Sequence, residues 1–243
     1  KKALFRLNSE IKVETLFYYL HEYSYGRIFT ILTKKYSPST VLVGVQHGPV
    51  SMRKLLYRAG KNELLIAGDS ITSCPIPHIV LAEDEYSANV YRDAGYCEVK
   101  VMETIYRLKY LECIIRDHVE NRKILVVPGL NDGPFMLKAI KNHIKRDDQN
   151  TYVVKPHPRA NSAYLNSYLQ IDNLIVSSDE IEDLLATVYM VYATYTSVAI
   201  EAVILGIDVV LVELPGKINE SPLLDTEFLE SVPGYGTVSL LEL

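Results

Sequence analysis

The feature that most constrains the fold is an alternation of short apolar, β-branched runs with helical stretches, which occurs twice along the chain. This alternation is typical of parallel sheets that are covered by helices on both faces. We therefore predict an α/β protein with two Rossmann-like lobes and a cleft between them, over residues 1–118 and 119–243. The first lobe is short, with about four strands, which leaves open that the chain lacks the first units of that lobe.

Each expected element follows from a local pattern of apolar residues and of glycine or proline breaks. The long helix 103–118 is expected to connect the lobes. We expect Gly95 to end the helix 85–94. Ser177, Ser178 and Asp179 are expected to cap the short helix 180–186. The predicted strands are 13–20, 41–45, 79–82, 99–102, 123–127, 152–154, 173–176, 188–192 and 209–212, and the predicted helices are 28–35, 51–59, 85–94, 103–118, 135–145, 163–169, 180–186 and 198–205.

Composition excludes several classes of protein. The chain is 48% hydrophobic and carries a net charge of −5 with acids and bases mixed, which is typical of a globular protein and argues against nucleic-acid binding. Cys74, Cys97 and Cys113 form no CxxC pair, so neither a structural zinc site nor a disulfide scaffold is expected. The apolar runs are shorter than a membrane span, and the first residues do not resemble a signal peptide. We expect a cytoplasmic protein, and peripheral association with the inner face of the cell membrane stays open.

The segment 151–158, TYVVKPHP, is the strongest functional signal. A buried strand ends at Lys155, and Pro156 stiffens the turn that presents Lys155 and His157. In open α/β sheets, ligands bind at this edge, and a cation beside an imidazole suits a phosphate. The alternative interpretation is a surface loop with a solvated lysine and a capping histidine.

Polar residues also follow the neighbouring strands of the second lobe, and parallel strands bring all these ends to one edge. Hydroxyl groups and free N–H groups at a helix start can form an anion site, although they also occur as simple helix caps. Glu201 lies one turn into the last of these helices, where its carboxylate could hold a ribose diol. The candidate donor-binding residues are Asn131, Lys155, His157, Ser178, Thr194, Thr196, Ser197 and Glu201.

The set VVKPHP, Ser178 and ATYTSVAIEAVILGIDVVLV resembles the donor half of GT-B glycosyltransferases that act on bacterial surface carbohydrates. The His-Pro and Ser/Thr motifs are similar to those of capsule and lipopolysaccharide Kdo transferases, bacterial sialyltransferases and teichoic-acid glycerophosphotransferases. That resemblance implies that His157, Thr196 and Ser197 hold the phosphate of a cytidine nucleotide, with Lys155 assisting. GVQHG and AGYCEVKVM in the first lobe resemble the acceptor lobe of the same enzymes.

The resemblance implies transfer of a sugar from a CMP- or CDP-linked donor to a surface polysaccharide or a lipid-linked glycan. The nucleotide sugar is then a substrate, and no further cofactor is expected. No metal is expected either, because a DxD triplet is absent, in keeping with metal-independent GT-B chemistry. Asn131-Asp132-Gly133 is similar to the acid-acid-Gly motif that carries the sialyltransferase base, but it lies in the donor lobe. We therefore do not assign Asp132 as the base.

Inverting transfer needs a base that takes the proton of the acceptor hydroxyl, and the first lobe offers two candidates. Glu22 lies among tyrosines that could raise the pKa of its carboxyl group. His47 lies on a turn bounded by glycine and could orient the acceptor or act as the base itself. The alternatives are an ion pair of Glu22 with Arg27 and a loop histidine without a catalytic role.

Two other functional hypotheses stay open. A UDP-sugar 2-epimerase has a similar fold and a similar serine-rich loop, but it needs more acids around the sugar than we find. A non-catalytic nucleotide-sugar-binding lobe of a larger polysaccharide-assembly protein would fit the short first lobe. A Rossmann dehydrogenase is disfavoured because no GxGxxG follows any strand.

Overall fold

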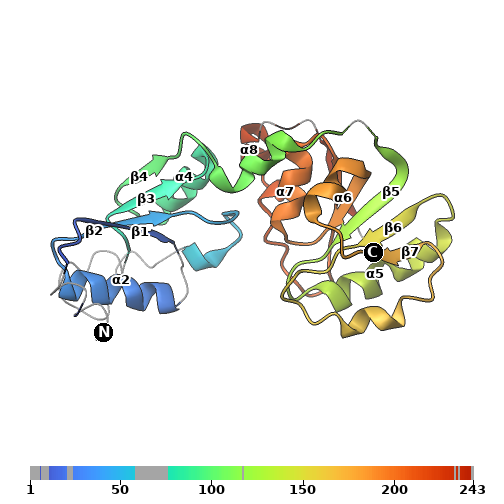
Figure 1. The fold of residues 1–243 in the computed structure, drawn as a ribbon, viewed down its shortest axis with the longest axis horizontal. Helices are drawn as coiled ribbons and strands as arrows, with labels where there is room; N and C mark the ends of the chain where they lie inside the picture. The colour runs from blue at the N-terminus through green and yellow to red at the C-terminus, as the bar shows by residue number, and fades with distance from the viewer. Residues whose placement is uncertain are drawn as a thin grey trace. The chain divides into compact units, whose positions relative to one another are not determined.

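The computed structural model describes residues 6, 11–20, 24–57, 76–116, 118–232, 234 and 236–241. The chain divides into two compact units, Lys1–Ile105 and Tyr106–Leu243 (Figure 1). Each unit contains one parallel sheet with helices between its strands, which confirms the predicted α/β class with two Rossmann-like lobes. The first unit ends in the sequence at Ile105, and the predicted division after residue 118 stays a prediction.

The described strands of the first lobe form a four-stranded parallel sheet in the order β1-β2-β3-β4. The central strand β2 is apolar throughout because both of its faces are covered, and Leu42 and Val43 are buried. The elements are β1 (Thr15–Tyr19), α2 (Ser24–Tyr36), β2 (Val41–Val45), η1 (Leu55–Tyr57), β3 (Ile79–Ala82), α4 (Glu85–Asp93) and β4 (Val99–Val101).

Helix α4 has the ends that its sequence predicts. Asp84 caps its start, and the Asp84 Oδ1 atom accepts a hydrogen bond of 2.6 Å from the Ser87 N–H group. Gly95 follows its last turn with φ of 91°, which is the left-handed conformation that glycine adopts without strain. Strand β3 therefore ends directly before a capped helix, and this cap holds the carboxyl end of the strand.

The second lobe contains a six-stranded parallel sheet in the order β10-β9-β8-β5-β6-β7. The order reverses at β5, which pairs with β6 on one side and with β8 on the other. The gap between the ends of β5 and β8 is the switch point at which ligands bind in such sheets. The elements are η2 (Tyr106–Cys113), β5 (Glu120–Val127), α5 (Gly133–Arg146), β6 (Thr151–Val154), η3 (Ala163–Ser167), β7 (Leu174–Val176), α6 (Ile181–Thr187), β8 (Val188–Ala193), α7 (Ser197–Ile204), β9 (Asp208–Val212), η4 (Pro222–Leu224), α8 (Thr226–Ser231) and β10 (Val238–Leu241).

The core of the second lobe lies on both faces of this sheet. Ile124 and Val126 of β5 pack with Met136 and Ile140 of α5, and all four side chains are buried. Helices α6 and α7 cover the opposite face (Figure 1). Burial on two faces explains why these strands read as continuous apolar runs rather than as alternating ones.

The predicted connecting helix 103–118 is wrong. Among the described residues of this range, only the 3₁₀ helix η2 (Tyr106–Cys113) forms. Leu111 is its one buried residue, and Ile115 beyond it is 70% exposed. The apolar spacing is therefore only partly buried, and an α-helix gains most of its stability from packing of its apolar face.

Other predicted helices need smaller corrections. The described part of 51–59 contains only η1, because the Ser51 hydroxyl accepts a hydrogen bond from the Arg53 N–H group and favours a turn. The segment near 163–169 is the 3₁₀ helix η3. Helix α6 begins after Glu180 without a side-chain cap, so the predicted capping by residues 177–179 is wrong. The Ser177 hydroxyl instead accepts a hydrogen bond from the Asp179 N–H group in the preceding turn. The sequence interpretation also missed η4, α8 and β10, which complete the lobe.

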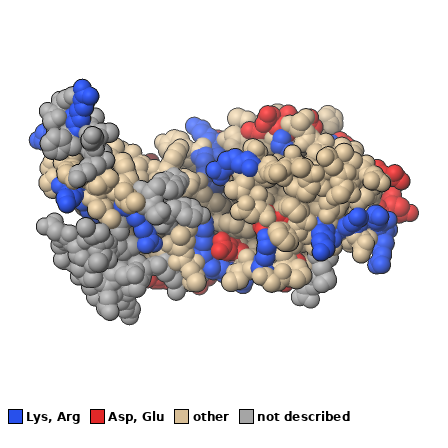
Figure 2. All heavy atoms as spheres, turned by 90° about the horizontal axis from the view of Figure 1, so that it is seen from below, with Lys and Arg blue, Asp and Glu red and all other residues tan. Residues whose placement is uncertain are grey.

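No helix in the described ranges is both long and apolar enough to cross a membrane. The face of the molecule in Figure 2 carries both basic and acidic side chains, in line with the mixed charges of the sequence.

Candidate functional site

A buried hydrogen bond joins the two strands at the switch point of the second lobe. The Gly129 N–H group, after β5, donates to the Thr194 hydroxyl oxygen, after β8, over 3.0 Å. A side chain at Gly129 would lie 2.8 Å from the Tyr195 carbonyl oxygen, so only glycine allows the two loops to approach this closely. Thr194 is therefore a structural bridge in addition to a predicted donor-binding residue.

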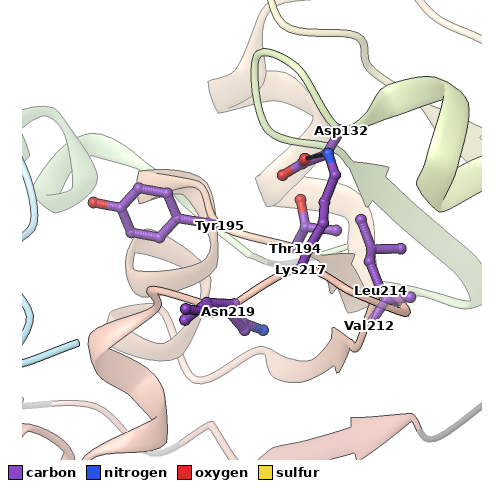
Figure 3. Close-up of a pocket in the computed structure, with 8 residues that line it drawn as sticks. Asp132, Thr194, Tyr195, Val212, Leu214, Lys217 and Asn219 are labelled. Carbon is purple, nitrogen blue, oxygen red and sulfur yellow. Dashed lines mark hydrogen bonds and ion pairs between the residues drawn. The ribbon is translucent and has the colours of Figure 1, made fainter. Parts of the chain in front are cut away.

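A small cavity of about 40 Å³ opens beside this bridge, at the carboxyl ends of β5, β8 and β9 (Figure 3). Its volume is enough for about three water-sized groups. Apolar side chains form one part of its wall, and polar side chains from the loops after the three strands form the rest. The lining residues are Asp132, Thr194, Tyr195, Val212, Leu214, Lys217, Ile218 and Asn219.

An ion pair crosses this cavity. The Lys217 Nζ atom lies 2.6 Å from the Asp132 Oδ1 atom, and Figure 3 shows the lysine side chain extending from its loop towards the carboxylate. The same ammonium group lies 4.1 Å from the centroid of the Phe135 ring. A carboxylate and an aromatic face together hold the Lys217 side chain over the pocket.

Asn219 supplies a donor that has no partner. Its Oδ1 atom accepts a hydrogen bond of 3.0 Å from the Ser221 N–H group, which fixes the orientation of the amide. Its Nδ2 atom is buried and makes no hydrogen bond to any residue that the structure describes. A buried amide N–H group without an acceptor is costly, so this atom is suited to an acceptor that enters the pocket.

Two predicted phosphate-binding features lie at the same edge of the sheet. Thr196 caps α7, and its hydroxyl accepts a hydrogen bond from the Val198 N–H group, while Ser197 begins the helix. His157 follows β6, two strand spacings or roughly 10 Å from β8. Burial and the nearby Arg159 charge lower the pKa of His157, so its ring is neutral at neutral pH. Its Nδ1 atom accepts from the Arg159 N–H group, which leaves the Nε2–H group as a donor.

Lys155 forms hydrogen bonds to the loop that follows β7. Its ammonium group donates to the carbonyl oxygens of Ser178 and Asp179, over 3.0 Å and 2.5 Å. Lys155 and Ser178 therefore lie at the same edge of the sheet, as the sequence predicted. Lys155 contacts the main chain of Ser178, and the Ser178 side chain is exposed. Asn131 lies on the turn after β5 and is also exposed.

Glu201 is buried on α7 and is held by the segment η2. The Tyr110 hydroxyl donates to the Glu201 Oε2 atom over 2.7 Å, and an Arg107 nitrogen lies 4.0 Å from Oε1. Burial and the Glu201 charge raise the pKa of Tyr110, so the phenol keeps its proton and remains a donor. Both carboxylate oxygens therefore have a partner within the lobe, and a ribose diol would share or displace them.

The strand ends of the first lobe carry a different arrangement. Gln46 follows β2, and its amide contacts the main chain of Glu83 and Gly48 and the Ser87 hydroxyl. His47 is exposed, with its ring 5.7 Å from that of Tyr19. The other predicted base, Glu22, lies outside the described residues.

The structure thus gathers only part of the predicted set at the pocket. Thr194 lines it, while Lys155, His157, Ser178, Thr196 and Ser197 lie on loops or helix starts at the same edge, and Asn131 adjoins Asp132. The sequence interpretation missed Lys217 and Asn219. The signal was the Leu-Pro-Gly-Lys turn after β9, where Gly216 has φ of 73° and presents the lysine at the end of a fifth strand.

No family model and no curated protein matches the sequence. Solved structures do match the fold. The UDP-GlcNAc 2-epimerase from Methanocaldococcus jannaschii is 12% identical over 99% of this chain and 69% of its own, with a TM-score of 0.56. MurG from Acinetobacter baumannii is 12% identical over 98% of this chain and 63% of its own, with a TM-score of 0.54. HepE from Anabaena, solved in complex with UDP and glucose, is 12% identical over 98% of this chain and 67% of its own, with a TM-score of 0.56.

These similarities identify the fold. Two Rossmann-like lobes of GT-B type are shared with these structures, which confirms the predicted fold. The chain spans 63 to 69% of the length of these three structures, and 60% of a Listeria monocytogenes structure that is also similar. The specific resemblance to Kdo transferases and sialyltransferases stays a prediction.

Proposed function

We propose that this chain binds a nucleotide-activated sugar through its second lobe and belongs to a metal-independent glycosyltransferase of GT-B type. The observation that carries the proposal is the set of donors at the carboxyl edge of the six-stranded sheet: the His157 Nε2–H group, the start of α7 at Ser197, and the pocket beside Thr194. The His157 Nε2–H group and the N–H groups at the start of α7 are donors that suit the phosphates of a nucleotide, and the pocket lies at the same edge for another part of the ligand.

The nature of the donor is part of the proposal. The motifs around His157 and Ser197 support a CMP- or CDP-linked donor, whereas the similar HepE structure contains UDP and glucose. The acceptor would be a surface polysaccharide or a lipid-linked glycan, with peripheral contact at the membrane. In an inverting transfer, the acceptor oxygen attacks the anomeric carbon, the bond to phosphate breaks, and a base takes the hydroxyl proton. Glu22 and His47 remain the proposed bases.

A UDP-sugar 2-epimerase is the second candidate. The TM-score with the M. jannaschii epimerase equals that with HepE, at 0.56, so the fold supports both reactions alike. An epimerase would invert carbon 2 of UDP-GlcNAc without any acceptor, and proton NMR of that substrate would detect the product.

The test of the proposed function is calorimetric titration of the chain with CMP, CDP, UDP and GDP. Saturable binding of one nucleotide is expected, and His157→Ala should weaken it by about 10- to 100-fold, because a hydrogen bond to a charged group is lost. His118→Ala is the matched control, since His118 is exposed and precedes β5 at the opposite edge of the sheet. This control should bind like the wild type.

Each outcome has a distinct meaning. Binding of a cytidine nucleotide would favour a CMP- or CDP-linked donor, and binding of UDP alone would shift the proposal to a UDP-linked donor or to the epimerase. Binding without turnover of any sugar nucleotide would favour the non-catalytic lobe. If no nucleotide binds, or if His157→Ala binds as well as the wild type, the proposed donor site is wrong.

A further inference from the structure

The described residues that line the pocket beside Thr194 carry no net charge. Among its lining residues only Asp132 and Lys217 are charged, and they form an ion pair with each other. The loop that carries Lys217 adds Glu213 and Glu220, so the chain around it supplies no surplus of positive charge. A carboxylate that entered this pocket would meet the Asp132 carboxylate together with the ammonium group that already neutralises it.

The pocket offers both hydrogen-bond donors and hydrogen-bond acceptors. The Asp132 Oδ2 atom can accept, the Lys217 ammonium group keeps further N–H donors besides the one aimed at Oδ1, and the Asn219 Nδ2 atom has no acceptor. A hydroxyl group both donates and accepts, whereas a carboxylate only accepts. Val212 and Leu214 offer an apolar wall of the kind that packs against the C–H groups of a sugar.

From these observations we propose that Asp132, Lys217 and Asn219 select a neutral, hydroxyl-bearing group on the donor and discriminate against a carboxylated one. The cavity of about 40 Å³ takes the hydroxyl groups, while the rest of the sugar lies at its mouth. This inference rests on the proposed function, and it runs against the sugar acids that Kdo transferases and sialyltransferases use. Asp132 and Lys217 are then specificity-determining residues.

The experiment compares two ligands that differ only in this group: UDP-glucose, with a hydroxymethyl group, and UDP-glucuronic acid, with a carboxylate. The affinity of each is divided by that of UDP, so that the ratio isolates the contribution of the sugar. If only cytidine nucleotides bind, CDP-glycerol is compared with CDP, and CMP-N-acetylneuraminic acid with CMP. In the wild type, the neutral group should be favoured by about tenfold, the effect of one uncompensated charge contact.

Asp132→Asn keeps the shape of the side chain and leaves Lys217 unpaired, so the preference should fall by about tenfold or reverse. Asp172→Asn is the matched control, because Asp172 is exposed at the amino edge of the sheet, and it should leave the preference unchanged. Lys217→Met tests the same pair from the other side and should weaken the neutral ligand while rejecting the carboxylated one further.

The two proposals fail in different ways. Absence of nucleotide binding would overturn the proposed function and this inference with it. Nucleotide binding with equal or better affinity for the carboxylated sugar in the wild type would overturn the inference alone. A preference for the neutral sugar that Asp132→Asn leaves unchanged would overturn it as well, because the ion pair would then have no part in selection.

Discussion

The two edges of the six-stranded sheet differ in how their polar side chains are satisfied. At the amino edge, the Asn173 amide donates to three carbonyl oxygens, those of Ile144, Asp147 and Asn150. The Asp147 carboxylate there accepts from the Tyr152 hydroxyl over 2.7 Å. At the carboxyl edge, Asn219 has the same amide group, and its nitrogen has no partner.

This difference separates stability from binding within one lobe. The amino edge closes its hydrogen bonds internally, so those residues contribute to the folded state. The carboxyl edge keeps a buried donor without an acceptor, which lowers the stability of the fold. This donor and the ion pair over the cavity leave hydrogen-bonding capacity for a ligand. What holds the carboxyl edge in place is the close approach of main chains at Gly129.

The largest loss of stability is expected from Gly129→Ala. The new methyl group would lie 2.8 Å from the Tyr195 carbonyl oxygen and 3.0 Å from the Asp132 Oδ2 atom. Because backbone must move to relieve this contact, we expect a loss of about 2–3 kcal/mol in the free energy of unfolding, measured by chemical denaturation, together with loss of nucleotide binding.

Gly48→Ala is the matched control for that change. Gly48 also follows a parallel strand, but no atom of the described residues lies within 4 Å of a Cβ atom added there. Its free energy of unfolding should stay within about 0.5 kcal/mol of the wild type. Equal effects of the two substitutions would show that main-chain fit at Gly129 does not hold the carboxyl edge.

Two identical substitutions compare the edges directly. Asn173→Ala leaves carbonyl oxygens at the amino edge without their donor and should lower the free energy of unfolding by about 1–3 kcal/mol. Asn219→Ala loses one hydrogen bond, from the Ser221 N–H group, but removes an unpartnered donor, so its cost should be within about 0.5 kcal/mol. Asn219→Ala should instead weaken binding of the sugar nucleotide. If stability and binding respond in the opposite pattern, the division between the edges is wrong.

The smallest effect concerns pH. The Thr237 hydroxyl and N–H groups both donate to the Asp208 Oδ1 atom and lower the pKa of Asp208. Because the folded pKa is depressed, this stabilisation is present above the unfolded pKa of about 4 and is lost as the pH falls through the folded value.

Thr237→Val should therefore reduce the free energy of unfolding at pH 7 by about 0.5 kcal/mol, since the carboxylate is largely solvated. The difference should shrink as the pH falls below about 4 and should vanish once the Asp208 carboxyl of the folded wild type is protonated. Denaturant titrations at pH 7 and over a series of falling pH values measure this change. A difference that persists at low pH would assign the effect to the side chain of Thr237 rather than to the charge of Asp208.

The sequence predicted the strands well because each apolar run is short, β-branched and bounded by glycine, proline or polar residues, as at Val41–Val45. Helices with a buried stripe, such as α5, were equally clear. Residues 106–113 were misread because helical spacing does not show how much of the apolar face becomes buried. Sequence spacing also predicts which residues lie at a strand end, but it does not predict which side chains they contact.

The candidate site shows the same limit. His157 and Ser197 could be expected at one edge because parallel strands all end on the same side. The Lys217–Asp132 pair could not, since the two residues are 85 positions apart and meet only through the order of β9, β8 and β5. Nor could the sequence reveal that Glu201 is held by Tyr110, because that contact spans 91 positions.

The long separation of the partners around the pocket has a consequence for folding. Gly129 and Thr194 are 65 residues apart, so their hydrogen bond forms only after a long chain segment has been closed and β8 has paired with β5. We therefore expect the binding pocket to be among the last parts of the lobe to form. A ligand that binds it would stabilise the completely folded lobe and no partially folded form, and the rise in melting temperature with ligand concentration would measure how cooperatively the lobe folds.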